Sequence, residues 1–216
     1  LVSSEDVIAL NDPASGYVSR AALKLIAGLE ASGVNPAGKI CLDLGASTGG
    51  FTQVLAEKGA RRIYAVDVGH NQLHPDVADL SQVISLEGLN ARDLDRSMIP
   101  EPIELLVCDV SFVSLPKIIA EPSRLCAQGA YAIVLIKPQF EVGRGHIGKG
   151  GIVREGSHVG QAIADVLSNM QSLGWRHLAS LPSPLLGGDG NSEVVAVFDL
   201  VDQPSTMVMP KASNPT

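Results

Sequence analysis

The chain of 216 residues lacks the features that would place it in a membrane or on an export route. No apolar run approaches the roughly 20 residues that a membrane-spanning helix needs, and no signal peptide is visible. The three cysteines, Cys41, Cys108 and Cys126, have no metal-ligand spacing, which is typical of reduced core thiols. We therefore expect a cytoplasmic protein that binds no metal ion and does not act on membranes.

Positive charge is also scarce, with 16 Lys and Arg residues against 23 Asp and Glu residues and a net charge of −7. Unaided binding to nucleic acid depends on cations that neutralise phosphates, so the chain as a whole is poorly suited to it. Residues 137–154 are an exception, with four cations, one acid and five glycines. They are predicted to form either a mobile solvated loop or a contact to a polyanion.

Apolar runs alternate with helical patterns along most of the chain. This alternation predicts an α/β fold, a Rossmann-like seven-stranded sheet that is mostly parallel, with helices on both faces. The last two strands are expected to pair antiparallel at the sheet edge. We expect residues 1–16 to be a linker, 17–201 the folded domain and 202–216 a flexible tail. The predicted strands are 40–44, 62–67, 82–86, 103–108, 130–136, 175–181 and 193–199, and the predicted helices are 19–31, 51–58, 115–127 and 157–173.

The most informative stretch is the glycine-rich turn at residues 43–52, Asp-Leu-Gly-Ala-Ser-Thr-Gly-Gly-Phe-Thr. A turn without bulky side chains lets a ligand approach the backbone. Asp67 ends the next apolar run, where an acid can hold ribose hydroxyls. The combination favours a nucleoside pocket over a turn that only connects a strand to a helix.

The turn also bears on which nucleoside binds. A dinucleotide site more often has Gly-x-Gly-x-x-Gly, whose amides cradle a pyrophosphate, whereas this turn reads Asp-x-Gly-x-Ser-x-Gly-Gly. Asp43 would repel a phosphate but attract the ammonium group of an amino acid, directly or through water. The pattern therefore favours S-adenosylmethionine as the cofactor, and an NAD-dependent oxidoreductase is a weaker alternative.

Four charged residues stand at the ends of apolar runs, namely Asp43, Asp67, Asp109 and Lys137. Ligands in parallel sheets bind beyond the carboxyl ends of the strands, so all four are predicted to face one crevice. A lysine at such a place is often a surface residue whose stem lies along the protein. An aspartate at the neighbouring strand end favours a functional role for Lys137 instead.

Further charged residues can join this group. Arg20 and Lys24 are four residues apart on the first predicted helix and share a face away from its apolar stripe, which also fits an ordinary solvated face. Glu193 begins the last predicted strand and can enter the crevice from the sheet edge. Lys24, Asp109, Lys137 and Glu193 are then predicted to form a charged tetrad.

Such a tetrad suits the activation of a hydroxyl group. A ribose 2′-hydroxyl is too weak an acid to attack a methyl sulfonium unaided, so a base must lie within hydrogen-bond reach. A lysine can be that base if a second cation and partial desolvation lower its pKa. Asp109 would orient the ammonium, Glu193 would position the other lysine, and methyl transfer itself would depend mainly on alignment.

Seven segments carry a resemblance to a known family. The chain resembles the TlyA (haemolysin A) family of ribosomal-RNA methyltransferases, whose catalytic domain is similar to the FtsJ-type 2′-O-ribose methyltransferases. The segments follow the family order over almost the whole folded region: 17–25, 43–52, 65–69, 109–115, 136–141, 151–154 and 190–193. The resemblance implies a class I methyltransferase fold and S-adenosyl-L-methionine as cofactor, with a cytidine ribose in ribosomal RNA as substrate.

The resemblance also implies roles for individual residues. The family's catalytic residues fall on Lys24, Asp109, Lys137 and Glu193. Its cofactor contacts fall on the turn and on the ends of the following strands: Asp43, Gly45, Ala46, Ser47, Gly49, Gly50, Phe51, Asp67, Val68, Asn90, Ala91 and Asp109. The segment 90–92 stands where such enzymes contact the adenine. Ala21 and Ala22 replace a pair that commonly contains glycine, a small departure that leaves the match at Lys24 intact.

The expected partner is ribosomal RNA or a ribosomal subunit, and we expect Arg20, Arg144, Lys149 and Arg154 to contact RNA. Family members usually carry a small basic RNA-binding domain ahead of the linker, and this sequence lacks it. Leu1 is not an initiator residue, and we expect RNA binding to be weak without that domain. A membrane-acting haemolysin and a methyltransferase that acts on a small molecule or a protein are the alternatives.

Overall fold

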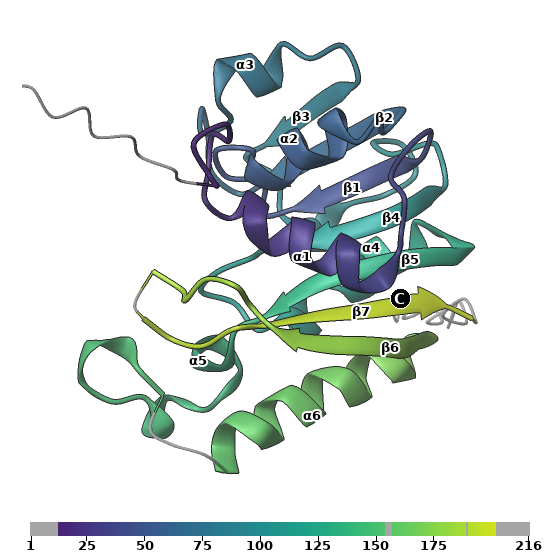
Figure 1. Ribbon diagram of the computed structural model, residues 1–216. Coiled ribbons are helices and arrows are strands. Elements are labelled where there is room, and N and C mark those ends of the chain that lie inside the picture. Colours follow the sequence, from purple (N-terminus) through teal and green to yellow (C-terminus); the bar gives the residue numbers. More distant parts are fainter. Residues whose placement is uncertain (1–12, 154–156, 189, 202–216) are drawn as a thin grey trace, which may run out of the picture.

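The computed structural model describes residues 13–153, 157–188 and 190–201, which form a three-layer α/β domain around one sheet (Figure 1). The predicted tail at 202–216 and most of the predicted linker lie outside the described residues. The seven strands run in the order β3-β2-β1-β4-β5-β7-β6. They are β1 (Ile40–Leu44), β2 (Arg62–Asp67), β3 (Val83–Glu87), β4 (Ile103–Cys108), β5 (Cys126–Ile136), β6 (Trp175–Pro182) and β7 (Val194–Leu200).

The direction of pairing confirms the predicted mixed sheet. Strands β3, β2, β1, β4 and β5 pair in parallel, and β7 pairs antiparallel with both β5 and β6. The one antiparallel strand among the described residues is therefore β7, one place inside the edge strand β6. The order reverses at β1, between β2 and β4, which is where ligands bind in open α/β sheets.

Side chains on successive strand positions enter two separate cores, one on each face of the sheet. In β1, Ile40, Leu42 and Leu44 pack into the core on one face, and Cys41 packs into the core on the other. This alternation follows from the pleat of a strand. Because both faces are covered, the central strands are near-continuous apolar runs, and that is why the sequence predicted them well.

Helices α1 (Ala22–Ser32) and α2 (Gly50–Glu57) cover one face. In Figure 1 they lie in front of the strands, whereas α6 (Ser157–Ser172) lies below β6 in this view. A Cβ atom at Gly28 of α1 would lie 2.7 Å from Ile133 Cγ2 of β5. Only glycine therefore allows α1 to pack this closely on the sheet.

The remaining helices are short and occupy the connections. They are α3 (Pro75–Ala78), α4 (Ala120–Arg124), α5 (Pro138–Glu141) and the 3₁₀ turns η1 (Ala91–Asp93), η2 (Leu115–Lys117), η3 (Arg144–His146) and η4 (Lys149–Gly151). The single helix predicted over 115–127 is wrong, because that range holds η2, α4 and the start of β5. Pro116 and Pro122 lack backbone N–H donors and favour interruptions in a helix, and Cys126 is already in the strand.

Candidate active site

The carboxyl ends of β1 and β4 meet so closely that the first residue of the turn after β1, Gly45, has no room for a side chain. Gly45 has a φ of +79°, and a Cβ atom there would lie 3.0 Å from the carbonyl oxygen of Asp109. Both the backbone conformation and this contact therefore require glycine. Gly50 is restricted in a similar way by Ser19, since its Cβ atom would lie 2.8 Å from Ser19 Cβ. The segment before α1 thus packs closely against the start of α2.

A cavity of about 660 Å³ opens beside this turn. Its size lies within the range of sites for small molecules and cofactors. Seven of the predicted cofactor residues line it: Gly45, Ser47, Asp67, Val68, Asn90, Ala91 and Asp109. The predicted cofactor residues, which follow or end the four strands β1 to β4, are thus brought to one cavity.

A smaller hollow of about 170 Å³ adjoins the cavity. The two share Gly45, Ser47, Asp109 and Ser111. Three other predicted cofactor residues, Ala46, Gly50 and Phe51, line only the hollow, and so does Lys137. The hollow therefore links the cavity to the predicted catalytic lysine.

Two predicted cofactor residues, Gly49 and Asp43, line neither space and instead make contacts inside the protein. Gly49 packs against Leu73, because a Cβ atom at Gly49 would lie 2.8 Å from Leu73 Cδ1. Asp43 is fully buried in β1, and its Oδ2 accepts a 2.6 Å hydrogen bond from the Thr52 hydroxyl of α2. Both residues shape the turn without contributing to its exposed wall.

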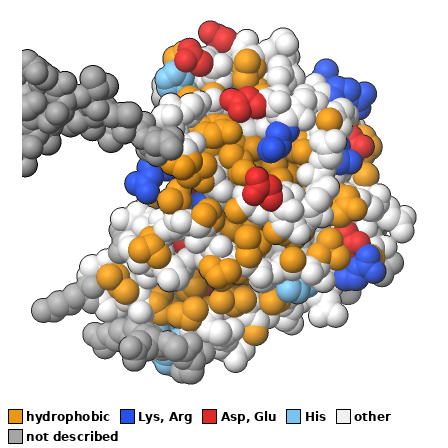
Figure 2. All heavy atoms as spheres, viewed as in Figure 1, with side chains coloured by type: hydrophobic (Ala, Val, Ile, Leu, Met, Phe, Trp, Pro, Cys, Tyr) orange, Lys and Arg blue, Asp and Glu red, His pale blue; other side chains and the backbone are white. Residues whose placement is uncertain are grey.

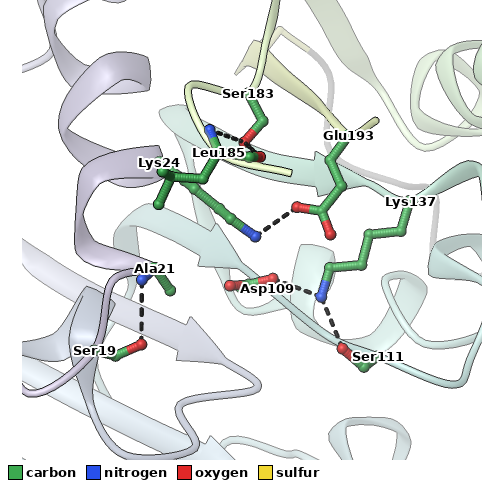
Figure 3. A network of polar contacts seen from close by, with 9 residues as sticks. All are labelled: Ser19, Ala21, Lys24, Asp109, Ser111, Lys137, Ser183, Leu185 and Glu193. Carbon is green, nitrogen blue, oxygen red and sulfur yellow. Dashed lines mark hydrogen bonds and ion pairs between the residues drawn. The ribbon is translucent and has the colours of Figure 1, made fainter. Parts of the chain in front are cut away.

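The four residues of the predicted tetrad come together as two buried ion pairs (Figure 3). Lys24 Nζ of α1 lies 2.5 Å from Glu193 Oε2, just before β7. Lys137 Nζ, at the end of β5, lies 2.7 Å from Asp109 Oδ1 and donates a 2.8 Å hydrogen bond to Ser111 Oγ. Figure 3 shows the four charged groups directed toward one another from α1 and from the ends of three strands.

Burial makes these pairs unusual. The side chains of Lys24 and Lys137 are 10% and 8% exposed, and that of Glu193 is 2% exposed. Taking charges out of water costs several kcal/mol for each ion, and a partner offsets that cost only in good geometry. Apolar side chains of similar volume often stabilise a fold at least as well as a buried ion pair. Two such pairs near one hollow therefore favour a catalytic role over a purely structural one.

Asp43 is the acid whose pKa is most strongly affected by its surroundings. Burial raises the pKa of the Asp43 carboxyl to about 7, and the nearby Asp109 and Asp67 carboxylates add to the rise. The Thr52 hydroxyl acts in the opposite direction. Asp43 Oδ1 has no hydrogen-bond partner within the described part of the chain. A buried acceptor without a partner fits a site that receives a positively charged group.

Asp67 shapes the nucleoside side of the cavity through its backbone contacts. Its Oδ2 accepts a 2.8 Å hydrogen bond from Ser47 N, and its Oδ1 accepts one of 2.8 Å from Gly69 N. These bonds tie the turn after β1 to the segment after β2. Each carboxylate oxygen has a second lone pair, so Asp67 can still accept hydrogen bonds from a ligand in the cavity.

The structure describes three of the four predicted RNA-contact residues. Arg20 is exposed, but it lies in the turn before α1 and not on the helix, so the expected face shared with buried Lys24 is wrong. Arg144 lies in η3 and Lys149 in η4, on the segment after α5, and Arg154 lies outside the described residues. On the face drawn in Figure 2, the cations of the described residues are scattered.

Several residues of the cavity rim were not singled out from the sequence. Phe112 is 89% exposed, has a φ of +65° and lies with its ring centroid 5.3 Å from that of Phe140. Gln72 and Lys117 also line the cavity, and so does Arg92 of the predicted segment 90–92. Phe112 lies three residues after the predicted Asp109, within the matched segment 109–115, and this was the available signal. Gln72 lies in a loop and Lys117 ends η2, and neither belongs to a matched segment.

A comparison with known proteins agrees with this geometry. The model of the FtsJ-like methyltransferase family matches residues 17–200, which is most of the chain. The chain belongs to the FtsJ-like methyltransferase family. This membership confirms the predicted fold class and indicates methyl transfer that depends on S-adenosylmethionine.

Individual relatives extend over most of the same region. The chain is 40% identical over 184 residues to "16S/23S rRNA (cytidine-2'-O)-methyltransferase TlyA" of Mycobacterium tuberculosis, a match that covers 85% of the chain and 69% of that relative. It is 40% identical over 183 residues to "Hemolysin A" of Brachyspira hyodysenteriae, covering 84% and 76% of the two chains. A crystal structure of a putative hemolysin from Lactococcus lactis superimposes with a TM-score of 0.83 at 37% identity, covering 86% and 89%.

Proposed function

We propose that this protein is an S-adenosylmethionine-dependent methyltransferase that methylates the 2′-hydroxyl of a cytidine ribose in ribosomal RNA. The observation that carries the proposal is the pair of buried lysine–carboxylate contacts beside a cavity of cofactor size. The printed name of the Mycobacterium tuberculosis relative supports both the reaction and the substrate class.

The residues at the three strand ends fit the proposed cofactor. Asp67 at the end of β2 would accept hydrogen bonds from the ribose, and the segment 90–92 would border the adenine. Asp43 Oδ1, which has no partner among the described residues, would attract the ammonium of the methionine moiety, directly or through water. When bound, S-adenosylmethionine supplies an electrophilic methyl group.

Lys137 is the residue best placed to remove the proton of the acceptor hydroxyl. Unlike Lys24, it lines the hollow that adjoins the cavity. In its neutral form the Nζ atom would accept the 2′ proton, while Ser111 and Asp109 hold the amine in position. Glu193 holds Lys24, whose positive charge would favour the oxygen anion that develops on the acceptor.

The rim of the cavity would receive the nucleotide. Arg92 and Lys117 line the cavity and can contact phosphates there, and Arg20 is an exposed cation in the turn before α1. Arg144, Lys149 and Arg154 are the cations of the glycine-rich segment. The net charge of −7 leads us to expect weak binding of this chain to naked RNA.

The direct test is to map methylated riboses by mass spectrometry in ribosomal RNA and ribosomal subunits treated with the protein and S-adenosylmethionine. A new 2′-O-methylcytidine, absent when S-adenosylmethionine is omitted, is the expected result. An intact pattern of ribose methylation in both naked RNA and subunits would contradict the proposed substrate. A screen of metabolite and protein acceptors in parallel would then test the alternative of a non-RNA methyltransferase.

The name of the Brachyspira hyodysenteriae relative keeps a membrane-acting haemolysin as the second candidate. Among the described residues, no helix combines the length and the apolar character needed to cross a membrane. Release of an encapsulated dye from liposomes measures this activity directly. We expect no release above a buffer control at concentrations that suffice for methyl transfer.

A further inference from the structure

Glu87 is a carboxylate next to the proposed cofactor cavity, and the proposed function gives it no role. Glu87 ends β3 and pairs in register with Asp67, the last residue of β2. Its Oε1 accepts hydrogen bonds of 2.7 Å from Gln72 N and 3.0 Å from Leu73 N, and its Oε2 accepts one of 2.9 Å from Asn71 N. One side chain thus holds three successive backbone amides.

The segment that Glu87 holds, residues 69–73, is a wall of the cavity. Gly69 and Gln72 both line the cavity next to Asp67. Gly69 N donates to Asp67 Oδ1, and Gly69 O accepts a 2.8 Å hydrogen bond from Gly88 N, directly after Glu87. The wall is therefore fixed to the two strand ends through Glu87 and its neighbour.

The same segment also contacts the glycine-rich turn. Leu73 packs on Gly49, as the 2.8 Å approach of its Cδ1 to a Cβ atom at Gly49 shows, and His74 N donates a 3.1 Å hydrogen bond to Thr48 O. Asn71 has a φ of +54°. Asparagine tolerates this conformation better than most other non-glycine residues, and the hydrogen bond from Asn71 N to Glu87 stabilises it here.

We propose that Glu87 is a positioning residue for S-adenosylmethionine, which pre-orders the 69–73 wall of the cavity and so raises affinity for the cofactor. The inference rests on the proposed function in one respect, that S-adenosylmethionine occupies this cavity. Asn71 and Gln72 are exposed, so water can replace Glu87 as the partner of their amides when the carboxylate is removed. The wall then loses its order while the fold persists, and the ligand must order it on binding.

The test compares Glu87→Ala with a matched control, Asp95→Ala. The Asp95 carboxylate also accepts hydrogen bonds from two successive backbone amides, those of Ser97 and Met98, but Asp95 does not line the cavity. Calorimetry with S-adenosyl-L-homocysteine should show a Kd about tenfold higher for Glu87→Ala and unchanged for Asp95→Ala. Glu87→Gln keeps one acceptor oxygen and should fall between wild type and Glu87→Ala.

Two further measurements separate positioning from a purely structural role. The KM for S-adenosylmethionine should rise in Glu87→Ala while kcat at saturating cofactor stays within about twofold. Hydrogen exchange of the 71–73 amides should become faster in Glu87→Ala, with the amides of β1 unchanged. A lower melting temperature with an unchanged Kd would overturn the proposal, as would an equal rise of Kd in Asp95→Ala. Wild-type protein that binds S-adenosyl-L-homocysteine but methylates no RNA would contradict the proposed substrate and leave this inference standing.

Discussion

The two ends of the sheet both carry ion pairs, but of different kinds. At the carboxyl ends, Lys24–Glu193 and Lys137–Asp109 are buried beside the hollow. Near the amino ends, Arg62 pairs with Glu101, and these side chains are 45% and 29% exposed. Exposed pairs are worth about 0.2–1 kcal/mol, whereas a buried charge that loses its partner costs about 3–5 kcal/mol. The same chemistry is thus an exposed surface contact at one end, and at the other end a pair of buried contacts that we propose to act in methyl transfer.

The largest difference between the two ends is expected in the rate of methyl transfer. Lys137→Met removes the proposed base, and kcat should fall by about 10³-fold while the Kd for S-adenosyl-L-homocysteine stays within about threefold. Arg62→Met, at the other end, should leave kcat unchanged. Single-turnover methylation of ribosomal subunits measures both variants. A Lys137→Met enzyme with wild-type kcat would contradict the assigned role.

The next effect concerns the stability of the fold. Glu193→Gln removes the negative charge next to buried Lys24, and the free energy of unfolding should fall by about 3 kcal/mol. Denaturant unfolding monitored by circular dichroism measures it. Lys24→Met combined with Glu193→Gln should recover part of the loss, because no unpaired charge is left buried. A loss below about 1 kcal/mol in Glu193→Gln would place this pair in the same class as the surface pairs.

Asp43 should make stability depend on pH in a direction opposite to that of most carboxylates. Because its folded-state pKa is raised to about 7, the folded state binds a proton that the unfolded state has released. The free energy of unfolding should therefore fall as pH rises from about 4 to about 7. Asp43→Asn keeps an acceptor for the Thr52 hydroxyl and should remove this contribution. Melting curves of both proteins across that range test it, and identical pH profiles would contradict it.

The smallest effect is expected at the surface pair. Glu101→Gln weakens the contact to Arg62 and should lower the free energy of unfolding by less than about 1 kcal/mol. The loss should shrink further at high salt. The same denaturant unfolding, at two salt concentrations, measures it. A loss as large as that of Glu193→Gln would remove the contrast between the two ends of the sheet.

Much of the site followed from sequence because parallel strands end at the same edge of a sheet. Asp67, Asp109 and Lys137 each stand at or near the end of an apolar run, so their convergence needed only the prediction of a parallel sheet. Asp43 was expected to face the same crevice, but it is buried in β1 and lines neither the cavity nor the hollow. The prediction of one helix over 115–127 was wrong for a local reason. It gave more weight to the helical spacing of apolar residues than to Pro116 and Pro122. The roles of all these residues in catalysis and binding stay predictions.

The sequence by itself determined the strands, the need for glycine at Gly45 and the position of acidic residues at the strand ends. These features depend on local spacing and on backbone conformations that few residue types can adopt. Only the tertiary structure decided that Lys24 meets Glu193 across 169 positions, since that contact needs β7 to insert between β5 and β6. It also decided that Glu87 holds the amides of Asn71, Gln72 and Leu73. Backbone amides are present at almost every residue, so the sequence shows no pattern that would identify the partners of Glu87. The path of the chain decides which amides come within reach of its carboxylate.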